Sequence, residues 1–118
     1  MPSPAELFDL SGKVEVVTGG SRGIGRAVCF ALAGAGADVV VASRKLDNCE
    51  TTAAEITEQT GRRVVPMAVN VSHWDQCGDL VDRVYDEFGH CEVLINNAGL
   101  SPLYPDLASV TEELYDKT

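Results

Sequence analysis

The sequence predicts an α/β fold with one parallel β-sheet, and three observations lead to this prediction. Short β-branched runs alternate with longer segments in which apolar residues recur every three or four positions. Hydrophobic residues make up 45% of the 118 residues and charged residues 23%, as in soluble globular proteins. No apolar run approaches the roughly 18 residues that a membrane-spanning helix needs. Strands separated by helices of this length form βαβ units, whose strands are parallel.

The first strand and the first helix of this alternation surround a glycine-rich turn. Residues 13–18 (KVEVVT) form a β-branched run that ends in this turn, which is the pattern of a buried strand. A helix is expected to begin at Ile24, and Gly34 and Gly36 supply its end. Its apolar face is predicted to comprise Ile24, Ala27, Val28, Ala31, Leu32 and Ala35.

The second and third strands enclose another helix. Residues 38–43 (DVVVAS) are a second buried run, and an amphipathic helix from residue 46 onward ends at Gly61. Residues 64–71 (VVPMAVNV) are the third predicted strand. Proline cannot donate a hydrogen bond to a neighbouring strand, so Pro66 is tolerated if this strand lies at an edge of the sheet.

The last part of the chain is expected to hold two helices and one strand. Ser72, with Asp75 three residues later, resembles a capping box and predicts a helix whose apolar face runs through residues 77–88. Residues 92–96 (EVLIN) are the fourth strand, and Thr111 begins a further helical pattern.

Right-handed crossovers give these strands the order 3-2-1-4, which is one half of a Rossmann-like, doubly wound sheet. We therefore expect residues 1–118 to form a single incomplete domain, truncated after its fourth strand. That strand would be an exposed apolar edge. Glu15 disagrees with a buried first strand, because an unpaired carboxylate there costs several kcal/mol or becomes protonated. Either Glu15 has a partner, or it lies nearer the end of the strand, or the chain is damaged.

Charge and cysteine content exclude several classes of function. The formal net charge of −9 repels phosphodiester backbones and anionic lipids, so nucleic acid and membrane partners are not expected. The cysteines show no metal-ligand spacing, and the first residues lack the pattern of a secretory signal. We expect a cytoplasmic protein without a metal site. The expected reduced thiols are Cys29, Cys49, Cys77 and Cys91.

The glycine-rich turn at residues 18–25 (TGGSRGIG) is the strongest functional signal. It stands between a predicted strand and a predicted helix, which is where a nucleotide pyrophosphate binds. Glycine lets the chain approach the phosphates closely, and the helix N-terminus adds partial positive charge. The residues expected to bind the cofactor here are Gly19, Ser21, Arg22, Gly23, Ile24 and Gly25.

This spacing resembles the Thr-Gly-x-x-x-Gly-x-Gly pattern of the short-chain dehydrogenase/reductase family. A second motif of that family, Asn96-Asn97-Ala98-Gly99, follows the fourth strand, and the resemblance extends over residues 10–117. It implies an oxidoreductase that transfers hydride between a nicotinamide dinucleotide and a carbonyl or alcohol substrate. Complete members are about twice as long, as a sheet with two halves requires. They are commonly homo-oligomers, an assembly expected only for the intact protein.

The end of the second strand favours NADP(H) over NAD(H). An NAD site usually has a carboxylate there, but this sequence has Ser43 and Arg44. Asp38 lies at the opposite end of the strand, and Asp47 lies a few residues into the next segment. Arg44 can hold a 2′-phosphate, and Arg22 resembles the second basic residue of family members that prefer NADP. Both arginines could otherwise be ordinary surface residues.

The resemblance implies further contacts at the ends of the third and fourth strands. Asn70 stands where relatives have an aspartate that accepts from the adenine amino group, and its side-chain oxygen could accept in the same way. Val71 would pack on the adenine face. Asn97 would brace the strand ends, and Ala98 and Gly99 would line the ribose and nicotinamide. A merely structural turn is the alternative for this last segment.

No catalytic residue is assigned. The resemblance implies a Tyr-x-x-x-Lys pair as acid or base, and a serine that polarises the substrate oxygen. None of Tyr85, Tyr104 and Tyr115 has a lysine four positions later, so this segment is predicted to be inactive by itself. Two alternatives stay open, namely a non-catalytic nucleotide-binding or relic polypeptide ending at Thr118, and a sugar-nucleotide epimerase. Whether the substrate is a thioester, sugar, steroid or small ketone is not encoded here.

Overall fold

The computed structural model describes residues 1–99 and 105–117. Four parallel strands form one sheet in the order β3-β2-β1-β4, which confirms the predicted fold class and strand order. Pro66 lies in β3 and therefore at a sheet edge, where its missing N–H costs no ladder hydrogen bond. The strands are β1 (Val14–Thr18), β2 (Asp38–Ser43), β3 (Val64–Ala68) and β4 (Val93–Ile95).

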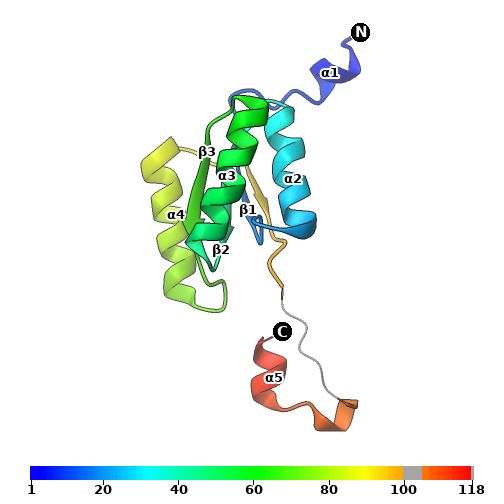
Figure 1. The fold of residues 1–118 in the computed structure, drawn as a ribbon, viewed down its shortest axis with the longest axis vertical. Coiled ribbons are helices and arrows are strands. Elements are labelled where there is room, and N and C mark those ends of the chain that lie inside the picture. Colours follow the sequence, from blue (N-terminus) through cyan, green and yellow to red (C-terminus); the bar gives the residue numbers. More distant parts are fainter. Residues whose placement is uncertain (100–104, 118) are drawn as a thin grey trace.

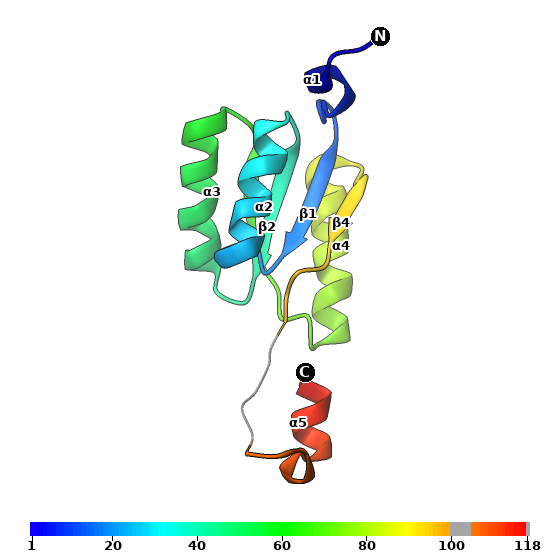
Figure 2. The same cartoon turned by 90° about the vertical axis from the view of Figure 1, so that its right-hand side faces the viewer.

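Helices cover both faces of this sheet. Figures 1 and 2 show α2 and α3 on one face and α4 on the other. The short elements η1 and α5 lie apart from the sheet, beyond the carboxyl ends of its strands (Figure 1). None of the described helices is long and apolar enough to cross a membrane. The helical elements are α1 (Pro4–Leu7), α2 (Gly23–Gly34), α3 (Leu46–Thr60), α4 (Trp74–Phe88), η1 (Leu107–Ser109) and α5 (Glu112–Lys117).

Two hydrophobic cores hold these layers together. Alternate strand residues point to opposite faces, so β1 and β2 contribute to both cores and every residue of β1 is buried. The core beneath α2 and α3 contains Val17, Cys29, Ala33, Ala37, Val39, Val41, Cys49, Ala53 and Ile56. The core beneath α4 contains Val14, Val16, Val40, Ala42, Met67, Val69, Leu80 and Val84.

Both outer strands are shorter than predicted, and side chains accept from backbone N–H groups just beyond them. β3 was expected to reach residue 71 but ends at Ala68, and the Asn70 N–H donates to Gln76 Oε1 at 2.8 Å. β4 was expected over residues 92–96 but spans only Val93–Ile95. Just beyond it, the Asn97 N–H donates to the Thr18 hydroxyl at 3.1 Å.

Two helix starts differ from the prediction. The short helix α1 was not expected, although the Ser3 hydroxyl accepts from the Glu6 N–H at 3.2 Å and Pro4 occupies its first turn. The predicted capping box of α4 is wrong. The residue before α4 is His73, which makes no side-chain cap. The Ser72 hydroxyl, which was predicted to cap this helix, instead donates to Asn70 Oδ1 at 2.6 Å.

The buried face of α2 is also different from the predicted one. Its buried residues are Gly25, Cys29 and Ala33, whereas Ile24 is 77% exposed. Ala27 and Ala31 are exposed as well, whereas the predicted Val28 and Leu32 are partly buried against the core. Small side chains face the sheet because α2 begins so close to the end of β1 that a Cβ at Gly25 would overlap the Gly19 carbonyl oxygen.

Candidate nucleotide-binding site

The glycine loop lies at the carboxyl end of β1 and is tied to the chain that follows β4. The Thr18 hydroxyl accepts from the backbone N–H groups of Asn97 and Ala98, both at 3.1 Å, and donates to the Ile95 carbonyl at 3.4 Å. One hydroxyl therefore uses its donor and both acceptor positions. The two segments that carry the recognised motifs are thus joined at one edge of the sheet.

Asn97 makes a second connection between these segments. Its Nδ2 donates to the Gly19 carbonyl oxygen at 3.2 Å, which is the bracing contact expected from the sequence. Gly19 has a φ of 66°, and a Cβ there would lie 2.9 Å from Asn97 Nδ2. A side chain at Gly19 would therefore be strained by its backbone angle and would also displace the bracing amide.

The first turn of α2 presents unpaired donors. The first bond into the helix is from the Arg26 N–H to the Arg22 carbonyl at 3.2 Å. In the part of the chain that the structure describes, the N–H groups of Gly23, Ile24 and Gly25 have no acceptor. No acidic residue stands in this turn, and the space beside Gly23, whose φ is 59°, is open. The helix dipole and these donors suit an anion such as a pyrophosphate.

Helix α3 holds the glycine loop from its other side. The Thr52 hydroxyl, which is only 3% exposed, donates to the Ser21 carbonyl at 2.9 Å. Sequence reasoning assigned no role to Thr52. The available signal was a polar residue at helical spacing from Cys49, Ala53 and Ile56, all of which are buried in α3.

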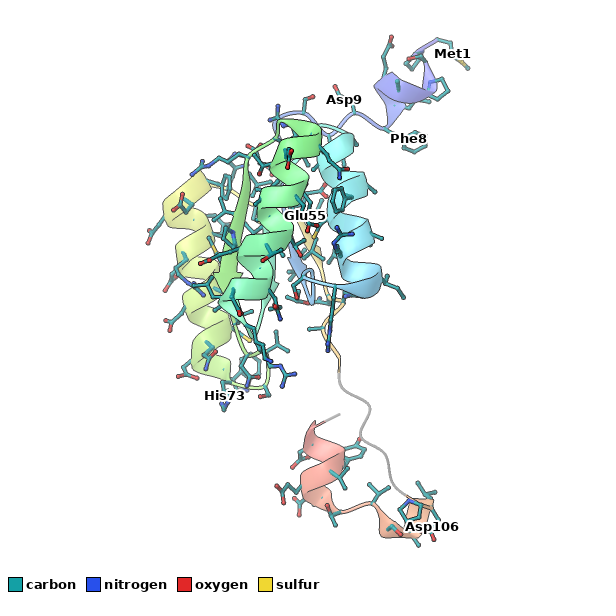
Figure 3. All side chains as sticks on the ribbon, viewed as in Figure 1. Met1, Phe8, Asp9, Glu55, His73 and Asp106 are labelled. Carbon is teal, nitrogen blue, oxygen red and sulfur yellow. The ribbon has the colours of Figure 1, made fainter. Side chains whose placement is uncertain are left out.

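A hollow of about 360 Å³ lies between the glycine loop and α3. Glu55, on the side of α3 that faces α2 (Figure 3), pairs with Arg26. Arg26 also stacks over the Phe30 ring, with its guanidinium carbon 4.7 Å from the ring centre. The hollow is lined by Ser21, Arg22, Arg26, Asn48, Thr51, Thr52 and Glu55.

The end of β2 carries an arginine for which the structure shows no ion pair among the described residues. Arg44 is exposed, directly after Ser43, whose hydroxyl lies 2.9 Å from the Cys49 thiol. Asp47 Oδ1 accepts from the Asn48 N–H at 3.0 Å, at the start of α3. Asp38 lies at the other end of β2 and pairs with Arg62 at 3.0 Å.

The two arginines of the predicted phosphate site come from neighbouring strand ends. Thr18 and Ala42 are paired in the sheet, so the loop that carries Arg22 starts beside the strand end that carries Arg44. Both arginine side chains are exposed. This arrangement leaves two cations open to a ligand at the carboxyl edge of the sheet.

Asn70 and Val71 follow β3 at the same edge. Val71 is 45% exposed and available to a ligand. The Asn70 side-chain oxygen, which sequence analysis offered to adenine, instead accepts from the Ser72 N–H at 3.0 Å and from the Ser72 hydroxyl at 2.6 Å. Ala98 and Gly99 are exposed beyond β4, and the Ala98 N–H is taken by Thr18.

The cysteines of the site are packing groups. Cys29 lies beneath the glycine loop, where its thiol donates to the Gly20 carbonyl at 3.8 Å. Burial raises the pKa of the Cys29 thiol to about 12, so this thiol stays protonated at neutral pH. Among residues 1–99 and 105–117, no group of three or more His, Cys, Asp and Glu could hold a metal ion. Tyr104 and Thr118 lie outside the described residues.

Comparison with known proteins points to one family. The model of the family described as short chain dehydrogenase matches residues 13–118. A short chain dehydrogenase of Pseudocercospora fijiensis is 43% identical over 96 residues, which are 81% of this chain and 31% of that protein. The short chain dehydrogenase/reductase astE of Aspergillus oryzae is 36% identical over 99% of this chain and 45% of its own length. The chain thus spans less than half the length of these relatives.

Solved structures give the same result. L-Sorbose reductase of Gluconobacter frateurii, complexed with NADPH and L-sorbose, superimposes with a TM-score of 0.87 at 33% identity. This match covers 92% of this chain and 41% of the reductase. A metagenomic short-chain oxidoreductase in complex with NADP gives a TM-score of 0.86 at 35% identity, over 92% of this chain and 48% of that chain.

Proposed function

The chain belongs to the short-chain dehydrogenase/reductase family, and we propose that residues 1–118 form a single NADP(H)-binding unit of such an oxidoreductase. One observation carries this proposal. Unpaired N–H groups at the start of α2 stand beside two exposed arginines, Arg22 and Arg44, while Asp38 pairs with Arg62 at the other end of β2.

The proposed ligand contacts follow from the charge of each group. The pyrophosphate would be held by the backbone of the glycine loop, including Gly19, Gly23 and Gly25, and by the dipole of α2. The 2′-phosphate would lie between Arg22 and Arg44, because guanidinium groups form paired, charge-assisted hydrogen bonds with phosphate. The presence of NADPH and NADP in two structural neighbours supports this preference.

The remaining predicted contacts place the nucleoside and nicotinamide along the same edge. Ser43 would face the adenosine ribose, Val71 the base, and the backbone at Ala98 and Gly99 the nicotinamide side. Asn97 holds the glycine loop in place through Gly19 and acts as a positioning residue. The bound cofactor would supply the hydride that passes to or from a small carbonyl or alcohol substrate.

The whole protein would need residues beyond this chain for the reaction. Residues 1–118 contain no Tyr-x-x-x-Lys pair, and they span less than half the length of their relatives. We therefore expect this chain to bind NADPH without catalysing hydride transfer by itself.

Titration of the 118-residue chain with NADPH and NADH, followed by cofactor fluorescence, tests the proposal. We expect the chain to bind NADPH more tightly than NADH. Arg44→Ala and Arg22→Ala should each lower the affinity for NADPH roughly tenfold or more, since each removes a charge-assisted contact. The affinity of these two variants for NADH should change little.

The matched control is Lys13→Ala, which removes an exposed positive charge at the opposite end of β1. This variant should bind both cofactors like the unaltered chain. Equal affinity for NADPH and NADH would contradict the phosphate assignment, and absence of binding to either would contradict the function.

A further inference from the structure

Donors from α2, α3 and the chain after β4 hold the carbonyl oxygens of the glycine loop. Each carbonyl oxygen of residues 19–22 accepts a hydrogen bond, at distances between 2.9 and 3.8 Å. The contact from α3 is made by a side chain that no predicted motif includes. The acceptors are Gly19, Gly20, Ser21 and Arg22, and their donors are, in the same order, Asn97, Cys29, Thr52 and Arg26.

Thr52 uses its hydroxyl differently from two other threonines of α3. The hydroxyls of Thr51 and Thr60 donate to the carbonyl four residues earlier in the same helix, at 3.0 and 2.7 Å, which is the usual bond of a helical threonine. The Thr52 hydroxyl is buried and donates at 2.9 Å to the Ser21 carbonyl, 31 positions earlier in the chain. This side chain therefore connects α3 to the glycine loop.

This hydrogen bond fixes the peptide group between Ser21 and Arg22. The described residues contain no cis peptide bond, and in a trans peptide the N–H points away from the preceding carbonyl. The Arg22 N–H therefore points away from Thr52, and within the described residues it has no acceptor. Arg22 itself is extended, with φ −157° and ψ 166°, and is exposed.

Loss of the Thr52 hydroxyl would change what this peptide group presents to a ligand. The Ser21 carbonyl would then face an apolar side chain, and a buried carbonyl without a donor is unfavourable. Rotation of the peptide toward solvent relieves this cost, but it turns the carbonyl oxygen toward the ligand and the Arg22 N–H toward α3. Both changes disfavour an anion beside Arg22.

We infer that Thr52 is a positioning residue that favours NADPH over NADH, because it holds Arg22 in the orientation that meets the 2′-phosphate. This inference rests on the proposed function, which places the 2′-phosphate between Arg22 and Arg44. The pyrophosphate part of the loop has separate supports, namely the contact of Asn97 with Gly19 and the first turn of α2. The effect of Thr52 therefore falls on the phosphate that NADH lacks.

The test measures the dissociation constants of NADPH and NADH on the 118-residue chain and on Thr52→Val, which removes the hydroxyl and nearly keeps the shape. The affinity for NADPH should fall about threefold to tenfold, the effect of one neutral hydrogen bond, while the affinity for NADH changes little. Thr52→Ser keeps the hydroxyl and should bind like the unaltered chain. The matched control is Thr57→Val, at an exposed position of α3 outside the hollow, and it should change neither affinity.

A double variant separates positioning from a general loss of stability. In the Arg22→Ala background, Thr52→Val should cause a much smaller further loss of NADPH affinity, because the side chain that it positions is gone. An equal loss for both cofactors, the same loss in the Arg22→Ala background, or a loss in Thr52→Ser as large as in Thr52→Val overturns the inference while the proposed function stands. Failure of the unaltered chain to bind either cofactor rejects both.

Discussion

Glu15 is a buried carboxyl group in the central strand of the sheet. It is 1% exposed, lies on β1 between Val39 and Val93, and its Oε2 has no hydrogen-bond partner among the described residues. Burial raises the pKa of Glu15, and the nearby charge of Glu92 raises it further. Of the explanations that the sequence left open, a partner is not observed among the described residues. Glu15 does lie near the amino end of the strand, as the second residue of β1, but it is buried there.

The pKa of Glu92, the residue before β4, is shifted in the opposite direction. Its Oε2 accepts from the Val14 N–H at 2.6 Å, and its other oxygen pairs with His90. The hydrogen bond from Val14 lowers the pKa of Glu92, and His90 lowers it further. The two carboxyl groups therefore give the folding stability opposite dependences on pH.

The pKa of Glu15 predicts how the stability of the chain responds to pH. The folded state holds the Glu15 proton more tightly than the unfolded state, whose pKa is near the ordinary 4.5. This contribution is fully present below that pH and is lost as the pH rises through the folded pKa. In Glu15→Gln the free energy of unfolding should therefore fall less steeply as the pH rises above 4.5, as measured by urea unfolding at a series of pH values.

Two further variants complete this test. Glu15→Val replaces the unpaired carboxyl group with an apolar side chain and should raise the free energy of unfolding at neutral pH by about 1–3 kcal/mol. Glu92→Gln should instead lower the stability at neutral pH, because it weakens the contacts to Val14 and His90. An unchanged pH slope in Glu15→Gln would show that this carboxyl group does not control the decline.

At the scale of the elements, the first turn of α2 packs tightly against the glycine loop, whereas its last turn has open space beside it. A Cβ at Gly25 would overlap the Gly19 carbonyl oxygen, which is backbone and cannot move without displacing the loop. At the other end of α2, a Cβ on Gly34 would meet nothing within 4 Å. The same substitution therefore has opposite consequences at the two ends of one helix.

Gly25→Ala and Gly34→Ala form a matched pair of variants. Gly25→Ala should destabilise the fold by about 1–3 kcal/mol and abolish NADPH binding, because the overlap distorts the glycine loop. Gly34→Ala should stabilise it by about 0.4–1 kcal/mol through the lower entropy of the unfolded chain. Thermal unfolding and NADPH titration measure both effects, and wild-type affinity in Gly25→Ala would contradict the proposed close approach of α2 to the loop.

At the scale of the whole molecule, the β4 edge of the sheet is left uncovered within the described residues. The radius of gyration is 16.2 Å, compared with about 13.5 Å for a compact domain of this length, because η1 and α5 stand apart from the sheet. Leu94 pairs with Val16 at the free edge and is 55% exposed. Val81 and Tyr85 on α4 are 54% and 52% exposed. An apolar strand edge of this kind favours association.

We expect the 118-residue chain to self-associate as its concentration rises, despite its net charge of −9. Leu94→Lys should reduce this association without lowering stability, because a charged edge strand resists pairing. Ala27→Lys, at an exposed position of α2, is the control and should leave association unchanged. Sedimentation over a concentration series makes the comparison, and equal association in both variants would locate the contact elsewhere.

Local sequence patterns were enough to predict the alternation of strands and helices, the strand order and the location of the glycine loop. These features depend on local patterns, namely β-branched runs, helical spacing and the glycines at residues 19, 23 and 25. Pro66 marked an edge strand for a reason equally local, because proline has no N–H. A resemblance carried by two short motifs then identified the family.

Which side chains meet depends on how the elements pack in three dimensions. Thr18 joins Asn97 across 79 positions of sequence, and Thr52 reaches Ser21 across 31. Periodicity selected Ile24 for the buried face of α2, but the close approach to Gly19 selected Gly25 instead. The sequence showed an asparagine at position 70 but not that its side-chain oxygen accepts from Ser72. Such outcomes depend on distances between residues far apart in the chain, which no local pattern contains.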